Sequence, residues 1–147
     1  MSEDNFMACK KNIPNNPNVS FINAAIWKED GDIEYMVGLN EQSNSIGLHE
    51  NASKNQVKKK VRAISIESLM KENAVQFVDY IKMDIEGAEI DVLFDSECKW
   101  LEKTGSIKIE VHKDDYISKT VDLLNNKGFK ASKDINHPFC VYGFKQN

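Results

Sequence analysis

The sequence predicts an α/β fold with a mostly parallel sheet and an antiparallel pair of strands at its C-terminal end. Residues 77–128 alternate between strand-like and helix-like segments, which is typical of parallel strands joined by helices. The last two strand-like segments, 129–132 and 138–144, leave little room for a helix between them, so we expect them to pair antiparallel. The chain has 147 residues, and we expect a single domain over 1–147.

The first half of the chain carries weaker structural signals. Apolar residues at helical spacing predict a short helix over 3–11, which a proline-containing segment ends. A run rich in β-branched and apolar residues predicts a strand over 19–27, and a second short strand is expected over 33–37. Residues 38–53 are rich in Asn, Ser, Gln and Glu, so we expect a loop there.

The second half of the chain carries clearer signals. Residues 57–66 are expected to be extended, and Ser65 is expected to cap a short helix that ends near Asn73. Gly128 is expected to close the last helix at its C-terminal cap. The remaining predicted elements are strands over 77–85 and 107–112 and helices over 88–101 and 116–126.

Composition excludes several classes of protein. The hydrophobic fraction of 41% and the charged fraction of 29% are those of an ordinary globular protein, and no apolar run approaches the length of a membrane span. The N-terminal residues lack the basic and apolar pattern of a secretory signal, so we expect a cytoplasmic protein. A net charge of −4 gives no general attraction to nucleic acid.

The chain has three cysteines, Cys9, Cys98 and Cys140. They are odd in number, widely spaced, and lack the paired spacing of a zinc site or a redox pair. We therefore expect reduced structural thiols and no metal site built on them.

Two strand-like segments carry charged residues at matching positions. Period-two alternation places apolar residues on one face of each strand and charged residues on the other. Strands joined by a single helical crossover lie parallel and usually adjacent, so their C-terminal ends fall on the same edge of the sheet, where open α/β sheets bind ligands. The side chains expected to cluster at that edge are Asp84, Glu86, Glu110 and His112.

A plainer interpretation of these charges stays open at this point. Lys82 and Lys108 could simply pair with these acids, or both strands could have one solvent-exposed face in an antiparallel sheet. Spacing alone does not choose between a ligand site and these alternatives.

The residues around the two strands resemble the signature of FkbM-family methyltransferases. The resemblance begins with IKMDIEGAE at 81–89, continues through Val92 and Leu93, and includes IKIEVH at 107–112. Upstream, 18–27 is similar to the family's third strand, and 43–47 resembles its small, polar loop on the substrate side. The resemblance covers nearly the whole chain.

The resemblance implies a Rossmann-like methyltransferase fold, in which a methyl group passes from S-adenosylmethionine to an acceptor. The acceptor in this family is commonly a hydroxyl, so we expect a small molecule or a carbohydrate. His112 and Asp84 are the candidates for the base that takes the hydroxyl proton, and Glu86 and Glu110 would orient the acceptor or the base. Glu89, in the first turn of the predicted helix, is expected to complement the helix dipole.

The resemblance also implies contacts with the cofactor. Asn23 and Ala24 match the family position near the adenine ring, and Asp84 is the third expected cofactor-binding residue. The family's first two strands, including the glycine-rich turn that receives the cofactor, have no counterpart in the sequence. We therefore expect poor cofactor affinity, an interrupted sheet, and pairing of copies of the chain through exposed sheet edges as one way to form a homo-oligomer.

Two other functions remain as alternatives at the sequence level. One is a non-catalytic remnant that binds a partner through uncovered sheet edges. The other is a metal-dependent hydrolase that uses Asp84, Glu86, Glu110 and His112 as ligands. The other two histidines, His49 and His137, lie in polar, turn-like contexts and are expected at the surface.

Overall fold

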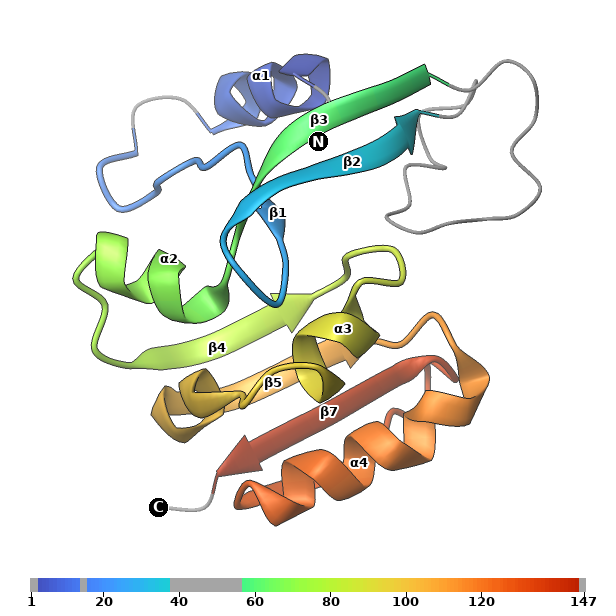
Figure 1. Cartoon of the computed structure of the whole chain (residues 1–147). Helices are drawn as coiled ribbons and strands as arrows, with labels where there is room; N and C mark the ends of the chain where they lie inside the picture. The colour runs from blue at the N-terminus through green and yellow to red at the C-terminus, as the bar shows by residue number, and fades with distance from the viewer. Residues whose placement is uncertain (1–2, 14–15, 38–56, 146–147) are drawn as a thin grey trace.

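The computed structural model describes residues 3–13, 16–37 and 57–145, and these form a mixed α/β structure with two separate sheets (Figure 1). The first sheet has the order β1-β3-β2, and its strands are β1 (Ala25–Ile26), β2 (Gly31–Val37) and β3 (Val57–Ile64). The second sheet has the order β4-β5-β7-β6, and its strands are β4 (Val78–Met83), β5 (Thr104–Glu110), β6 (Phe129–Lys133) and β7 (Cys140–Lys145).

The strand directions correct the expected sheet. Two of the described strand pairs are parallel, β1 with β3 and β4 with β5, whereas the other three are antiparallel. The expectation of a mostly parallel sheet is therefore wrong, because β2 returns directly along β3 and β7 enters between β5 and β6. The expected antiparallel pair at the C-terminal end is confirmed as β6 and β7, and the expected interruption is seen as two separate sheets.

The predicted strand over 19–27 is much shorter than expected. Within the part of the chain that the structure describes, its strand pairing is limited to Ala25 and Ile26, in parallel register with Ala63 and Ile64. The segment before them begins in a turn, where the Val19 amide donates to the Asn16 carbonyl at 3.1 Å. A sequence rich in β-forming residues becomes a strand only where a partner strand bonds to its backbone N–H and C=O groups. Residues 19–24 have no such partner strand among the described residues.

The helices lie where the sequence predicts them, with one exception. They are α1 (Glu3–Asn12), α2 (Ile66–Glu72), α3 (Glu89–Phe94) and α4 (Ile117–Asn126), with 3₁₀ turns η1 (Lys99–Lys103) and η2 (Asp114–Tyr116). Ser65 caps α2 by accepting a hydrogen bond from the Ser68 amide, and Gly128 follows α4 at a φ of +85°. No helix in the described ranges is long and apolar enough to cross a membrane.

The exception is the predicted helix over 88–101, which divides into α3 and η1. The Ser96 hydroxyl donates to the Val92 carbonyl at 2.7 Å, and the Cys98 thiol donates to the Leu93 carbonyl at 3.2 Å. Cys98 itself adopts a left-handed φ of 49°. These side chains satisfy the last carbonyls of α3, so the helix ends there instead of continuing.

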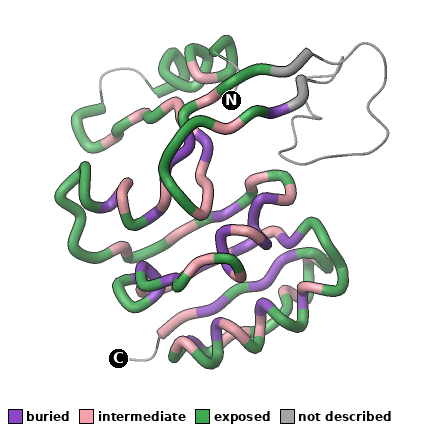
Figure 2. Tube along the Cα trace, in the orientation of Figure 1, coloured by how far each residue is buried: buried purple, intermediate pink, exposed green. Residues whose placement is uncertain are grey.

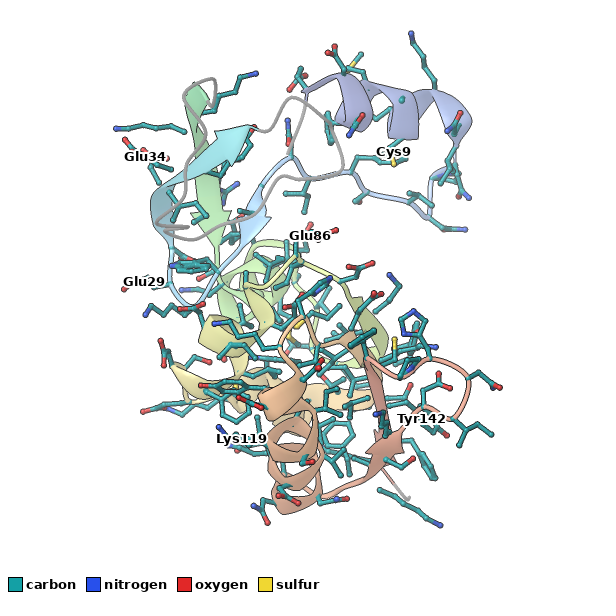
Figure 3. All side chains as sticks on the ribbon, turned by 90° about the vertical axis from the view of Figure 1, so that its right-hand side faces the viewer. Cys9, Glu29, Glu34, Glu86, Lys119 and Tyr142 are labelled. Carbon is teal, nitrogen blue, oxygen red and sulfur yellow. The ribbon has the colours of Figure 1, made fainter. Side chains whose placement is uncertain are left out.

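The core lies between the second sheet and the helices that cover one of its faces (Figures 1 and 2). Ile107 and Ile109 on β5 are fully buried there, together with Trp100 of η1 and Leu124 of α4. The opposite face of the second sheet is open, and Tyr142 of β7 projects from it, on the side away from α4 (Figure 3). The exposed aromatic ring of Tyr142 indicates that no described element covers this face.

Asp30 ties the start of β2 to the N-terminus of α2. Its carboxylate accepts a hydrogen bond from the Ser65 amide at 2.8 Å and another from the Ser68 hydroxyl at 2.6 Å. These two bonds, the backbone one first, lower the pKa of Asp30 below its ordinary value of 3.8.

Replacing Asp30 should make the free energy of unfolding depend less on pH in the acid range. Because the folded carboxyl has the lower pKa, its contribution is fully present above the unfolded pKa and is lost as the pH falls through the folded pKa. We expect Asp30→Asn to be less stable than wild type at neutral pH, with the difference shrinking on the acid side of 3.8. Urea unfolding at a series of pH values from neutral to acid measures this difference in stability, with Asp32→Asn, at an exposed residue, as the control. A constant difference at all pH values would contradict this role.

The thiols should differ sharply in reactivity. Cys9 is exposed, whereas Cys98 and Cys140 are 1% and 3% exposed. Burial raises the pKa of both buried thiols, so little reactive thiolate is present at neutral pH. A colorimetric thiol assay should therefore find one fast-reacting thiol in the native protein and all three after unfolding. Fast modification that survives Cys9→Ser would contradict this assignment.

Candidate functional site

A sharp turn follows β4 and leads into α3. Glu86 and Gly87 occupy it with left-handed φ values of 55° and 101°. Glycine adopts this conformation without the steric cost that a side chain brings, whereas Glu86 must be held in it by its surroundings. The Ala88 amide closes the turn by donating to the Ile85 carbonyl at 3.3 Å.

The turn is organised by the carboxylate of Glu89, which is fully buried. Glu89 Oε1 accepts a hydrogen bond from the Ile85 amide at 2.9 Å, and Oε2 accepts one from the Gly87 amide at 3.0 Å. The interpretation that Glu89 simply complements the helix dipole does not include this role. The carboxylate instead caps the backbone of the turn that precedes its own helix.

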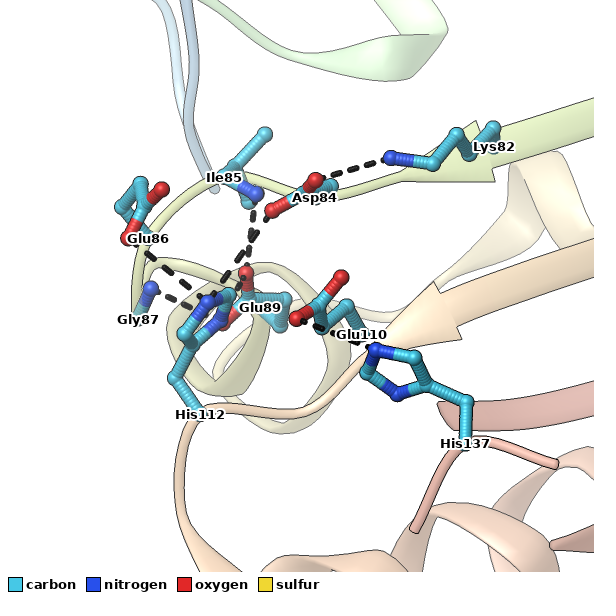
Figure 4. A network of polar contacts seen from close by, with 9 residues as sticks. All are labelled: Lys82, Asp84, Ile85, Glu86, Gly87, Glu89, Glu110, His112 and His137. Atoms are coloured by element: carbon cyan, nitrogen blue, oxygen red, sulfur yellow. Dashed lines mark hydrogen bonds and ion pairs between the residues drawn. The ribbon is translucent and has the colours of Figure 1, made fainter. Parts of the chain in front are cut away.

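His112 completes the network around the buried carboxylate of Glu89 (Figure 4). Its Nδ1 lies 3.0 Å from Glu89 Oε1. An ionised carboxylate can only accept, so Nδ1 is the donor in this contact. Nε2 lies 3.6 Å from Glu86 Oε2 and 3.9 Å from Asp84 Oδ1, so it faces two carboxylates at the edge of the second sheet.

Three of the four predicted site residues therefore meet, namely Asp84, Glu86 and His112. The fourth, Glu110, makes its described ion pair with His137 instead, at 3.9 Å from the Nε2 atom. The reason is that β5 ends at Glu110, so the alternation of faces that linked Glu110 to His112 stops there. His137 was expected at the surface, and its side chain is 45% exposed, but the ring contacts Glu110.

The lysines of the two strands are both paired. Lys82 donates to Asp84 at 2.8 Å, and Lys108 donates to Asp134 at 2.8 Å. The hydrogen bond to Asp84 raises the pKa of Lys82, and the bond from Lys108 lowers the pKa of Asp134. The plainer interpretation is thus correct for Lys82, which pairs with one of the site acids. It is wrong for Lys108, which pairs with Asp134 instead, and β4 and β5 do not pair antiparallel. It also does not account for His112.

The predicted cofactor-binding residues are not brought together. Asn23 Nδ2 donates to Glu3 Oε2 of α1 at 2.8 Å, and no described contact joins Asn23 or Ala24 to Asp84. Their neighbours Ile22 and Ile26 do line a cleft of about 540 Å³ between the 18–26 segment, α2 and β4. His49 and the loop at 43–47 lie outside the described residues.

The architecture and the site together define a class of protein. This is an α/β protein with a histidine bonded to a buried carboxylate at the C-terminal end of two adjacent parallel strands, which is where such sheets bind ligands. The family model described as methyltransferase FkbM domain matches residues 4–131, and the chain belongs to that family. Searches of curated proteins and of solved structures found no match.

Removing the Glu89 carboxylate should destabilise the fold. Glu89→Gln places an amide NH₂ group opposite backbone donors, so one buried donor loses its partner, at a cost of about 1–3 kcal/mol. Chemical denaturation measures the change in the free energy of unfolding. Glu86→Gln is the matched control, because Glu86 lies in the same turn with a side chain that is 55% exposed. Equal effects of the two substitutions would contradict the structural role of Glu89.

Proposed function

We propose that the chain acts in S-adenosylmethionine-dependent methylation of a hydroxyl on a small molecule or sugar, with His112 as the base. The supporting observation is the hydrogen bond from His112 Nδ1 to the buried Glu89 carboxylate. This bond fixes the tautomer and leaves Nε2 able to accept a proton. The family membership supports methyl transfer as the reaction.

The residues around His112 have separate roles in this proposal. The acceptor hydroxyl gives its proton to Nε2, and the resulting imidazolium is stabilised by the Glu89 carboxylate on its other nitrogen. Glu86 and Asp84 face the same Nε2 atom and would orient the hydroxyl and balance the new positive charge. A positioned base of this kind contributes about 10²- to 10⁴-fold to the rate.

The cofactor fits the described residues only in part. When bound, S-adenosylmethionine supplies the methyl group. The cleft beside β4 has apolar walls that include Ile26, Ile66 and Ile81, which suit an adenine ring. No carboxylate is among the lining residues in the described part of the chain, so the ribose hydroxyls lack their usual acceptors there. We therefore expect weak cofactor binding.

One observation bears on the metal-dependent alternative. Asp84, Glu86 and His112 each offer a ligand atom, and these atoms lie within 4.8 Å of one another. All three residues are exposed, however. Their ligand atoms are close together because His112 faces the two acids as an ion-pair partner. The geometry is therefore already accounted for by the His112 network, and it does not favour a hydrolase.

The proposal is tested with S-adenosylmethionine labelled at its methyl group and a panel of hydroxylated acceptors such as catechol and simple monosaccharides. We expect label transfer to at least one acceptor and a fall of about 10²- to 10⁴-fold in kcat for His112→Gln. Gln retains a side-chain donor toward Glu89 but cannot take the proton. Asp122→Asn, at an exposed position of α4 away from His112, is the control variant, and we expect it to transfer label as wild type does.

Two results would contradict the proposal. Undiminished transfer by His112→Gln would remove His112 as the base. No label transfer to any acceptor, together with no calorimetric heat for S-adenosylmethionine, would exclude methyltransferase activity of this chain. Thermal unfolding of each variant separates these results from loss of the fold.

A further inference from the structure

A second group of potential metal ligands lies outside the His112 network. Its members are Glu110 at the end of β5, Cys140 at the start of β7, and His137 in the connection between β6 and β7. Each offers one ligand atom, and the three atoms lie within 4.8 Å of one another. Figure 4 shows His137 and Glu110 facing each other, beside the His112 network.

The backbone fixes the positions of these three residues. Glu110 and Cys140 are direct cross-strand partners in the antiparallel pair of β5 and β7. The Cys140 amide donates to the His137 carbonyl at 2.9 Å, which closes the turn between them. The Val111 amide donates to the Phe139 carbonyl at 2.8 Å and holds that turn against the end of β5. The backbone from which the three ligand side chains extend is therefore held in place by hydrogen bonds.

The spacing suits a tetrahedral ion after small side-chain movements. Zinc binds sulfur, nitrogen and oxygen at about 2.0–2.3 Å, so neighbouring ligand atoms lie about 3.5 Å apart. His137 Nε2 and Glu110 Oε1 are already 3.9 Å apart, and the side chains of His137 and Glu110 are 45% and 28% exposed. Rotation of these two partly exposed side chains toward the buried Cys140 thiol can close the remaining gap.

The chemistry of the three ligands matches zinc better than the harder divalent ions. Thiolate and imidazole ligands favour zinc, whereas magnesium and calcium favour oxygen. A thiolate and a carboxylate together balance a divalent charge. The nearby ammonium groups are already paired, Lys108 with Asp134 and Lys82 with Asp84.

We propose that Glu110, His137 and Cys140 form a zinc-binding site with a fourth position open to water. On binding, the thiol proton passes to solvent and the sulfur takes the metal in its place. The ion would fasten the β6–β7 connection to the end of β5. Because His112 follows Glu110 by two residues, the ion would also restrain the segment that carries the proposed base.

Cobalt(II) is the probe for this site, because a cobalt–thiolate bond gives a charge-transfer absorption band that oxygen and nitrogen ligands do not. We expect one equivalent of cobalt, added without oxygen, to produce this band, and one equivalent of zinc to remove it. Cys140→Ser should abolish the band, whereas Cys9→Ser should retain it, since Cys9 is exposed on α1. Zinc should also raise the midpoint of thermal unfolding in wild type and not in Cys140→Ser.

Two further variants distinguish the proposed zinc site from the His112 network, and they keep the test valid if Cys140→Ser does not fold. Glu110→Gln should weaken cobalt binding by more than about 100-fold, since loss of a residue that only supports a ligand already costs about 10- to 100-fold. His112→Gln should leave the cobalt band unchanged. The proposal fails if no thiolate band forms, if the band survives Cys140→Ser, or if His112→Gln removes it.

Discussion

Burying the carboxylate of Glu89 is tolerated only because three donors face it. The two backbone amides of the turn and the His112 ring each occupy one of its acceptor positions. An unpaired charge at this place would cost several kcal/mol, so the carboxylate and its donors are fixed together. The left-handed turn, the start of α3 and the orientation of His112 all depend on this single group.

The position of the site follows from the pairing of β4 with β5. The two strands run parallel in register from Val78 to Met83, so both end at the same edge of the second sheet. The turn after β4 and the segment after β5 then meet, and this brings Glu89 to His112. Since β7 runs antiparallel beside β5, its first residue reaches the same edge, and Cys140 comes to lie opposite Glu110.

Much of the second sheet could be predicted from the sequence, because each of its elements carries a local signal. The alternation of apolar and charged residues predicted which side chains of β4 and β5 share a face, and Gly128 predicted where α4 ends. The division of the helix over 88–101 could not be predicted, since it depends on Ser96 and Cys98 bonding to carbonyls of α3. Local propensity contains no information about such side-chain competition.

The site was predictable to a similar degree. Asp84, Glu86 and His112 follow from strand topology, whereas the role of Glu89 requires the geometry of the turn. One signal was available, since a glutamate lies two residues after a glycine that follows a strand. The pairing of Glu110 with His137 joins residues far apart in the sequence, and only the placement of β7 brings them together.

The way the chain is divided between the two sheets also bears on how it folds. The second sheet is built from one continuous stretch, 78–145, and each of its pairs of neighbouring strands is joined at five positions. In the first sheet, β1 pairs with β3 at two described positions, Ala25 with Ala63 and Ile26 with Ile64, although this pairing closes as long a stretch of chain as the pairing of Ser106 with Phe144. Loop closure must be completed before such distant contacts stabilise anything, so β1, which gains fewer paired positions for the same closure, is expected to join its sheet last and to separate first. The histidine network, which lies on the second sheet, would therefore be assembled without waiting for β1.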